Sequence, residues 1–183
     1  MGITRTLTPD EFWSMVQDSN DRVRASFKDY PLFAPAQWSG TVMLGQWSFS
    51  GDGPRGLMHG LPAESEPFIQ VMTSPADAKS SAMTLWRRHH PFPQDKAEHV
   101  RNLENFAAES PVRRSVLVGG SARDFDVWER ETEWWAVAEG PECQILIEAQ
   151  NIDPSELALV TVEDVEPYIA GRNEWTREQR GET

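Results

Sequence analysis

The sequence predicts an α+β fold in which a mainly antiparallel β-sheet carries about three longer helices. Residues 115–170 contain successive short runs of β-branched and aromatic residues separated by turn residues, which is typical of strands laid side by side. Earlier segments instead repeat apolar residues at helical spacing. The chain of 183 residues suits one domain, which we expect over residues 1–172, followed by a polar C-terminal tail at 173–183.

The first predicted helix begins at a capping box. Thr8 and Glu11 have the spacing of such a box, and Pro9 occupies the first helical position. Apolar residues then recur on one face, and the helix should end before Pro31 because the residue before a proline avoids helical backbone angles. Residues 31–40 are predicted to form a proline-rich loop that packs on the domain through its large apolar residues.

The middle of the chain predicts strands followed by helices. Residues 41–49 and 56–61 should form a hairpin, and residues 67–73 a third strand. Apolar residues at helical spacing then predict helices at 76–90 and 94–109, each ended by a proline.

The hairpin turn contains the pattern G-x-G-x-x-G at residues 51–56, which also occurs in dinucleotide sites. Such a site needs a helix directly after the glycines. Gly60 and Pro62 break that helix, so we interpret the pattern as a turn.

The C-terminal part predicts a strand with one buried face, a short helical turn at 153–156 and a last helix at 163–170 that Gly171 ends. The buried strand face comprises Cys143, Ile145, Ile147 and Ala149. The residues predicted to be mostly buried in the core are Phe12, Val16, Trp86, Leu103, Val137, Ile145 and Ile147.

The charge balance restricts the classes of partner. The chain has 17 Lys and Arg against 29 Asp and Glu, a net charge of −12. Such a surface repels nucleic-acid phosphates and anionic membranes, and it favours a cationic partner. A lone cysteine, Cys143, and the lack of an apolar run of about 20 residues predict a cytoplasmic protein.

The candidate binding surface combines alternating acids with flanking tryptophans. Residues at alternate positions project from the same side of a strand, so these acids should stand in a row. Like charges at that spacing favour solvent, an arginine or a cationic partner. Aromatic residues beside charged ones are typical of an interface anchor with a polar rim. The candidate binding residues are Glu129, Glu131, Glu133, Trp128, Trp134 and Trp135.

An alternative ligand site lies one strand earlier. The stretch VGGSARDFD, which ends at Asp126, resembles the Gly/Ser and Asp-x-Asp elements of the DNA polymerase β-type nucleotidyltransferases. The resemblance implies a phosphate-binding turn at Gly120 and Ser121, with Mg²⁺-binding carboxylates at Asp124, Asp126 and Glu148. The alternative is a β-turn in which the glycine and serine residues simply reverse the chain.

A helical hairpin offers a second, incomplete site. This hairpin would bring His89 and His99 together beside Asp95 or Glu98. The spacing of these residues does not specify a complete zinc site. We therefore predict no metal and no cofactor.

No serine, cysteine or phosphate-loop signature identifies catalytic residues. The acidity and the aromatic residues favour a non-catalytic protein-binding function, of the inhibitor or immunity type, toward a basic protein. The alternative is a small enzyme or ligand-binding domain, nucleotidyltransferase-like or metal-dependent, that uses the 119–126 turn or the His89/His99 hairpin.

Overall fold

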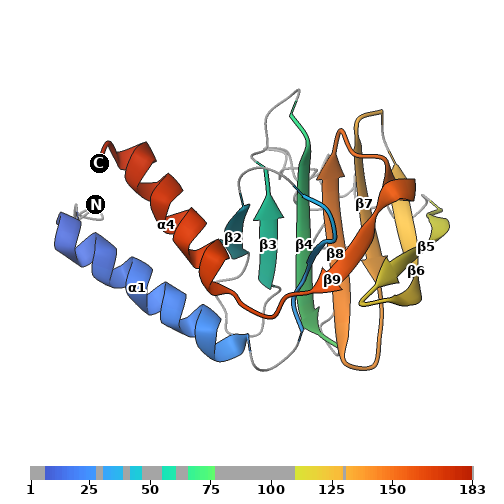
Figure 1. Ribbon diagram of the computed structural model, residues 1–183, viewed down its shortest axis with the longest axis horizontal. Helices are drawn as coiled ribbons and strands as arrows, with labels where there is room; N and C mark the ends of the chain where they lie inside the picture. The colour runs from blue at the N-terminus through green and yellow to red at the C-terminus, as the bar shows by residue number, and fades with distance from the viewer. Residues whose placement is uncertain are drawn as a thin grey trace, which may run out of the picture.

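The computed structural model describes residues 7–27, 31–38, 42–46, 55–60, 66–76, 110–129 and 131–182 (Figure 1). Its longer helices are α1 (Pro9–Ser26) and α4 (Glu166–Arg180), and a short 3₁₀ turn, η1, covers Pro154–Glu156. The strands are β1 (Phe33–Pro35), β2 (Val42–Gln46), β3 (Arg55–His59), β4 (Phe68–Pro75), β5 (Val112–Val118), β6 (Ser121–Glu129), β7 (Glu133–Ala138), β8 (Cys143–Gln150) and β9 (Ala158–Thr161).

These strands form one curled sheet in the order β1-β9-β5-β6-β7-β8-β4-β3-β2. All neighbouring strands are antiparallel except β5 and β9, which run parallel. Strand β1 also contacts β3 and β4, so the two ends of the sheet approach each other and the sheet forms a nearly closed barrel (Figure 1). The predicted α+β class and mainly antiparallel sheet are confirmed. The described part of the chain has two longer helices rather than three, and the helices expected at 76–90 and 94–109 fall almost wholly outside it.

The barrel interior is an apolar core, as the alternation in β8 predicted. Cys143, Ile145, Ile147 and Ala149 all face it and are at most 1% exposed. Inward residues of β4, β5, β6, β7 and β9 complete this cluster, together with Phe33 of β1. The outward face is also buried over β4, β7 and β8, so β4 is buried along nearly its whole length rather than at alternate residues.

The prediction of a loop at 31–40 is wrong in one respect, because part of this segment forms strand β1. Leu32, Phe33 and Ala34 are buried, and Phe33 and Pro35 lie opposite Thr161 and Leu159 of β9. The apolar residues of this segment do pack on the domain, but they do so as a strand. A proline is tolerated at the end of a strand where its missing N–H interrupts little of the ladder.

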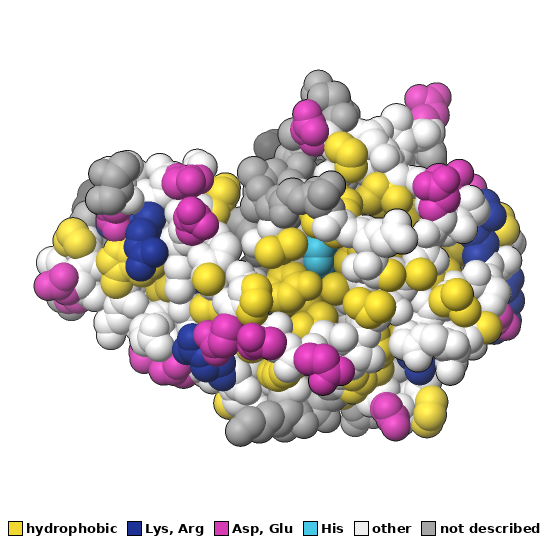
Figure 2. All heavy atoms as spheres, in the orientation of Figure 1, with side chains coloured by type: hydrophobic (Ala, Val, Ile, Leu, Met, Phe, Trp, Pro, Cys, Tyr) yellow, Lys and Arg dark blue, Asp and Glu magenta, His cyan; other side chains and the backbone are white. Residues whose placement is uncertain are grey.

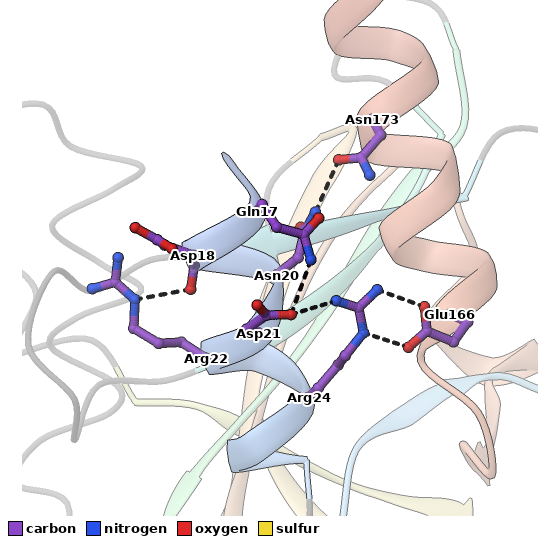
Figure 3. A network of polar contacts seen from close by, with 8 residues as sticks. All are labelled: Gln17, Asp18, Asn20, Asp21, Arg22, Arg24, Glu166 and Asn173. Atoms are coloured by element: carbon purple, nitrogen blue, oxygen red, sulfur yellow. Dashed lines mark hydrogen bonds and ion pairs between the residues drawn. The ribbon is translucent and has the colours of Figure 1, made fainter. Parts of the chain in front are cut away.

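Helices α1 and α4 lie side by side and antiparallel, next to the barrel (Figure 1). The predicted capping box opens α1, because the Thr8 hydroxyl accepts from the Glu11 N–H and Glu11 accepts from the Thr8 N–H. At the far end of α1, Arg24 donates two hydrogen bonds of 2.6 and 2.8 Å to Glu166, the first residue of α4 (Figure 3). Near the middle, Asn20 donates to Asn173 over 3.3 Å.

The last predicted helix is wrong at both ends. Helix α4 begins at Glu166 and continues through Gly171 to Arg180, so most of the expected polar tail is helical. Gly171 does not end the helix; a Cβ atom there would lie 2.1 Å from the carbonyl oxygen of Val42 in the edge strand β2. Its lack of a side chain instead lets α4 approach the backbone of β2 closely, which covers an edge that would otherwise be open to pairing with another chain.

The remaining core predictions are largely confirmed within the described residues. Val16 and Val137 are buried, as are the two isoleucines of β8 already described. Phe12 is only half-buried, because it lies on the outer part of the helix pair with the Arg180 guanidinium 4.1 Å from the centre of its ring. Trp86 and Leu103 lie outside the described residues.

A second buried cluster joins the helix pair to the barrel, and we call it the helix junction. It comprises Val23, Leu32, Ala34, Leu57, Val165 and Ile169, with Phe27, Val162 and Tyr168 at its margin. Figure 2 shows apolar side chains gathered between the helix pair and the barrel, with acidic side chains around them.

His59 of β3 borders the helix junction and is 2% exposed. Its Nε2 atom lies 3.3 Å from the Tyr168 hydroxyl, and its ring meets those of Tyr168 and Trp38 edge to face. Burial lowers the pKa of His59 to about 4, so the ring is neutral at pH 7.

Candidate functional site

The candidate site is a cleft of about 450 Å³ at the end of the barrel where β6 ends and β7 begins. A cleft of this size is in the range of small-molecule and side-chain binding sites. It is lined by Arg114, Glu129, Glu131, Thr132, Trp134, Asn151, Ile152, Asp153 and Pro154.

Two turns and one buried tryptophan build its walls. Asn151 follows β8 with a φ of 54°, a left-handed conformation that asparagine tolerates better than most residues. In this conformation its N–H donates to the Thr132 carbonyl over 2.8 Å, which joins the end of β8 to the β6–β7 turn. The indole N–H of Trp134 donates to the Ile152 carbonyl over 2.8 Å and fixes the next segment in place.

The cleft is acidic. Among the residues that the structure describes, its lining includes three acids, Glu129, Glu131 and Asp153, and one arginine, Arg114. Arg114 donates to Glu129 through Nε at 2.7 Å and also through its terminal nitrogen, so these two side chains hold each other on neighbouring strands. Glu131 projects from the turn and is exposed.

Asp153 is held in its charged form by local contacts. Its carboxylate accepts from the hydroxyl of Ser155 at 2.7 Å and from the Ser155 N–H at 2.8 Å, which caps the 3₁₀ turn η1. The Ser155 hydroxyl, the Ser155 N–H and the nearby charge of Arg114 together lower the pKa of Asp153. This carboxylate therefore carries its charge at neutral pH.

The predicted row of three glutamates is wrong, because the chain turns between them. Glu129 is the last residue of β6, Glu131 lies in the turn and Glu133 is the first residue of β7. Glu129 lies opposite Trp134 on the side that faces the cleft, whereas Glu133 lies opposite Gln150 on the outer face. Only Glu129 and Glu131 of the three therefore line the cleft.

The predicted tryptophans divide in the same way. Trp134 lines the cleft and packs into the barrel core. Trp128 and Trp135 lie directly opposite each other on the outer face of the sheet, where Trp135 is 1% exposed. They form a cross-strand aromatic pair rather than part of the cleft.

The alternative site at the 119–126 turn does not assemble. Gly119 and Gly120 have φ values of 57° and 83°, and they form a two-residue hairpin turn that joins β5 to β6. Ser121 lies directly opposite Val118 as the first pair of this hairpin, so the glycines lead into a strand rather than into a phosphate-binding helix. This geometry fits the other interpretation of the stretch, a β-turn that reverses the chain.

The acids of that site do not converge either. Asp124 lies 3.7 Å from Arg113 in an exposed ion pair, and Asp126 lies two residues further along the same face. Glu148 is two strands away and opposite Trp135. Within the residues that the structure describes, no group of three acids, histidines or cysteines is arranged to hold a metal ion. His89 and His99 of the predicted hairpin lie outside those residues.

The sequence interpretation missed the second wall of the cleft, formed by residues 151–154. The short helical turn at 153–156 was predicted and is present, with Asp153 as its cap. The sequence therefore identified Asp153 as the start of a helical turn. It did not show that this turn lies beside Glu129, because the two residues are far apart in the sequence.

Comparisons with known proteins found no counterpart. No protein-family model, no curated protein and no solved structure matches the chain. Among the described residues, no helix has the length and apolar character needed to cross a bilayer.

Proposed function

We propose that this protein is a non-catalytic binding protein that recognises a basic partner protein at the acidic cleft. The observation that carries the proposal is the convergence of Glu129, Glu131 and Asp153 on one cleft, where Arg114 supplies the one guanidinium among the described lining residues. A lysine or arginine side chain of a partner supplies the charge that such a cleft favours.

The arrangement supports this proposal because the cleft is organised before any partner arrives. Arg114 holds Glu129, and Ser155 holds Asp153, so a cation meets carboxylates whose positions are already restricted. Preorganised groups lose less conformational freedom on binding, which favours affinity. The net charge of −12 also steers a basic partner toward the surface and raises its association rate at low salt.

Direct binding of a labelled hexalysine peptide tests this proposal, with fluorescence anisotropy as the readout and a hexaglutamate peptide as the negative control. We expect hexalysine to bind and its affinity to fall as salt is raised. Glu131→Gln should weaken binding about twofold to fivefold, the range expected for loss of one exposed ion pair.

Glu133→Gln is the matched control, since it removes the same charge from the opposite face of the sheet. The two variants should differ, with Glu133→Gln close to the wild-type affinity. Equal weakening by both variants would show that only the overall charge attracts the peptide, and the cleft would no longer be the proposed site.

A further inference from the structure

A second hollow, which we call the apolar pocket, opens at the same end of the barrel. It has a volume of about 380 Å³ and is lined by Pro35, Ala36, Gln37, Trp38, Ile69, Ile152, Glu156, Leu157 and Ala158. These residues come from the end of β1 and the segment after it, the start of β4, and the segment between β8 and the first residue of β9.

The pocket reaches the barrel core. Ile69 is fully buried and belongs to the core cluster, and the side chains of Trp38, Ile152 and Leu157 pack against the same cluster. Backbone contacts fix the walls, because the Ala36 N–H donates to the Ala158 carbonyl over 2.8 Å. The pocket therefore has a floor and walls that do not depend on an occupant.

Its lining differs from that of the acidic cleft. Among the described residues that line the pocket, Glu156 is the one charged residue, and the others are apolar apart from Gln37. Such a lining binds apolar groups through the surface that they remove from water.

The two hollows are neighbours, because Ile152 lines both. The bond from Trp134 to the Ile152 carbonyl holds this dividing residue. A partner whose basic side chain enters the cleft on one side of Ile152 therefore has its adjacent side chains beside the mouth of the pocket. Successive residues of an extended segment are about 3.3 Å apart, so the two side chains need be only a short distance apart in sequence.

We propose that the apolar pocket binds a large aliphatic or aromatic side chain that lies next to the basic residue in the partner. This inference rests on the proposed function and narrows it, since the recognised segment would carry a basic and an apolar residue close together. Charge complementarity at the adjoining cleft is the reason to assign the pocket to a segment of the basic partner rather than to a free apolar molecule.

Three synthetic peptides of equal length test the inference. The first carries lysines with a neighbouring leucine, the second replaces the leucine with serine, and the third keeps the leucine but replaces the lysines with serine. Burying a leucine side chain contributes about 1.5 kcal/mol or more, so the first peptide should bind about tenfold more tightly than the second.

A pocket-filling variant tests the location. Ala158→Leu should bring the affinities of the first two peptides close together while leaving that of the lysine–serine peptide unchanged. Ala36→Leu adds the same side chain at another lining residue of the pocket. It replaces Ala158→Leu in the test if that variant has a lower thermal midpoint than the wild-type protein. Ala122→Leu adds the same side chain at an exposed position of β6, away from both hollows, and should retain the tenfold preference.

The outcomes separate the two proposals. Equal binding of the leucine and serine peptides to the wild-type protein would overturn the apolar pocket as a recognition site while leaving the acidic cleft supported. A preference for leucine that survives both pocket-filling variants would place the apolar contact elsewhere and also overturn it. Binding of the leucine-only peptide as tightly as the lysine–leucine peptide would instead overturn the basic partner.

Discussion

The barrel core and the helix junction are both buried, but different contacts build them. In the core, many apolar side chains from neighbouring strands share the packing, and the residues of β8 face it in strict alternation. The junction depends on a few special residues: a glycine that permits close approach, a neutral histidine and an exposed ion pair. The core should therefore lose stability wherever a large side chain is removed, whereas the junction should respond to pH and to an added methyl group.

The largest effect is expected in the core. Ile147 is fully buried, so Ile147→Ala should destabilise the protein by about 2–5 kcal/mol through loss of apolar burial and formation of a cavity. Urea unfolding of the variant measures this cost. Val160→Ala, at a position that is 45% exposed, is the control and should change stability little. An unchanged midpoint for Ile147→Ala would show that this face of β8 does not form the core.

The junction should lose stability in acid through His59. The folded protein takes up a proton on this ring only near pH 4, whereas the unfolded chain does so near pH 6.5. The stability is therefore fully present above pH 6.5 and falls as the pH is lowered toward 4, by on the order of 3 kcal/mol in total. Urea unfolding at pH 7 and pH 5 measures the loss.

His59→Phe keeps an aromatic ring but cannot be protonated, so it should lose less stability between the two pH values than the wild-type protein. Carboxylates elsewhere contribute equally to both proteins, and the difference isolates His59. Identical losses would mean that His59 is not the group that titrates in this range.

The close approach of α4 to β2 predicts an effect of unusual sign. Replacing a glycine inside a helix by alanine ordinarily stabilises it by up to about 1 kcal/mol. Here the new Cβ atom would lie 2.1 Å from the Val42 carbonyl oxygen, so Gly171→Ala should instead destabilise by about 1–3 kcal/mol. Thermal unfolding decides the sign. Ala170→Gly, at the exposed neighbouring position, should cost only the ordinary helix preference, and a stabilised Gly171→Ala would show that α4 does not contact β2 this closely.

The smallest effect is expected at the ion pair between Arg24 and Glu166. The arginine lowers the pKa of Glu166, but both side chains are exposed to water, which screens their attraction. Glu166→Gln should therefore lower the thermal midpoint less than Gly171→Ala does, and the difference should shrink in high salt. Glu163→Gln removes the same charge three residues earlier and provides the comparison. A loss for Glu166→Gln as large as that for Gly171→Ala would make the ion pair a principal contact of the junction.

Local sequence patterns determined the parts of this protein that depend on near neighbours. The capping box at Thr8 involves residues three apart, and the inward face of β8 follows from alternation along one strand. The hairpin at Gly119 and Gly120 likewise follows from turn residues between two strands. In each case the residues that decide the structure are close together in the sequence, so their pattern is sufficient to predict it.

The tertiary structure decided the parts that depend on distant partners. Gly171 has the residue type of a helix end, but the position of β2 gives it a different role. One turn between Glu129 and Glu133 places the two acids on opposite faces, and the same folding brings Asp153 beside Glu129 to form the cleft. The physical reason is that strand register and the approach of one element to another are set by the packing of the whole barrel. A single-sequence pattern records which side chains alternate or repeat, but not which distant segment they will meet.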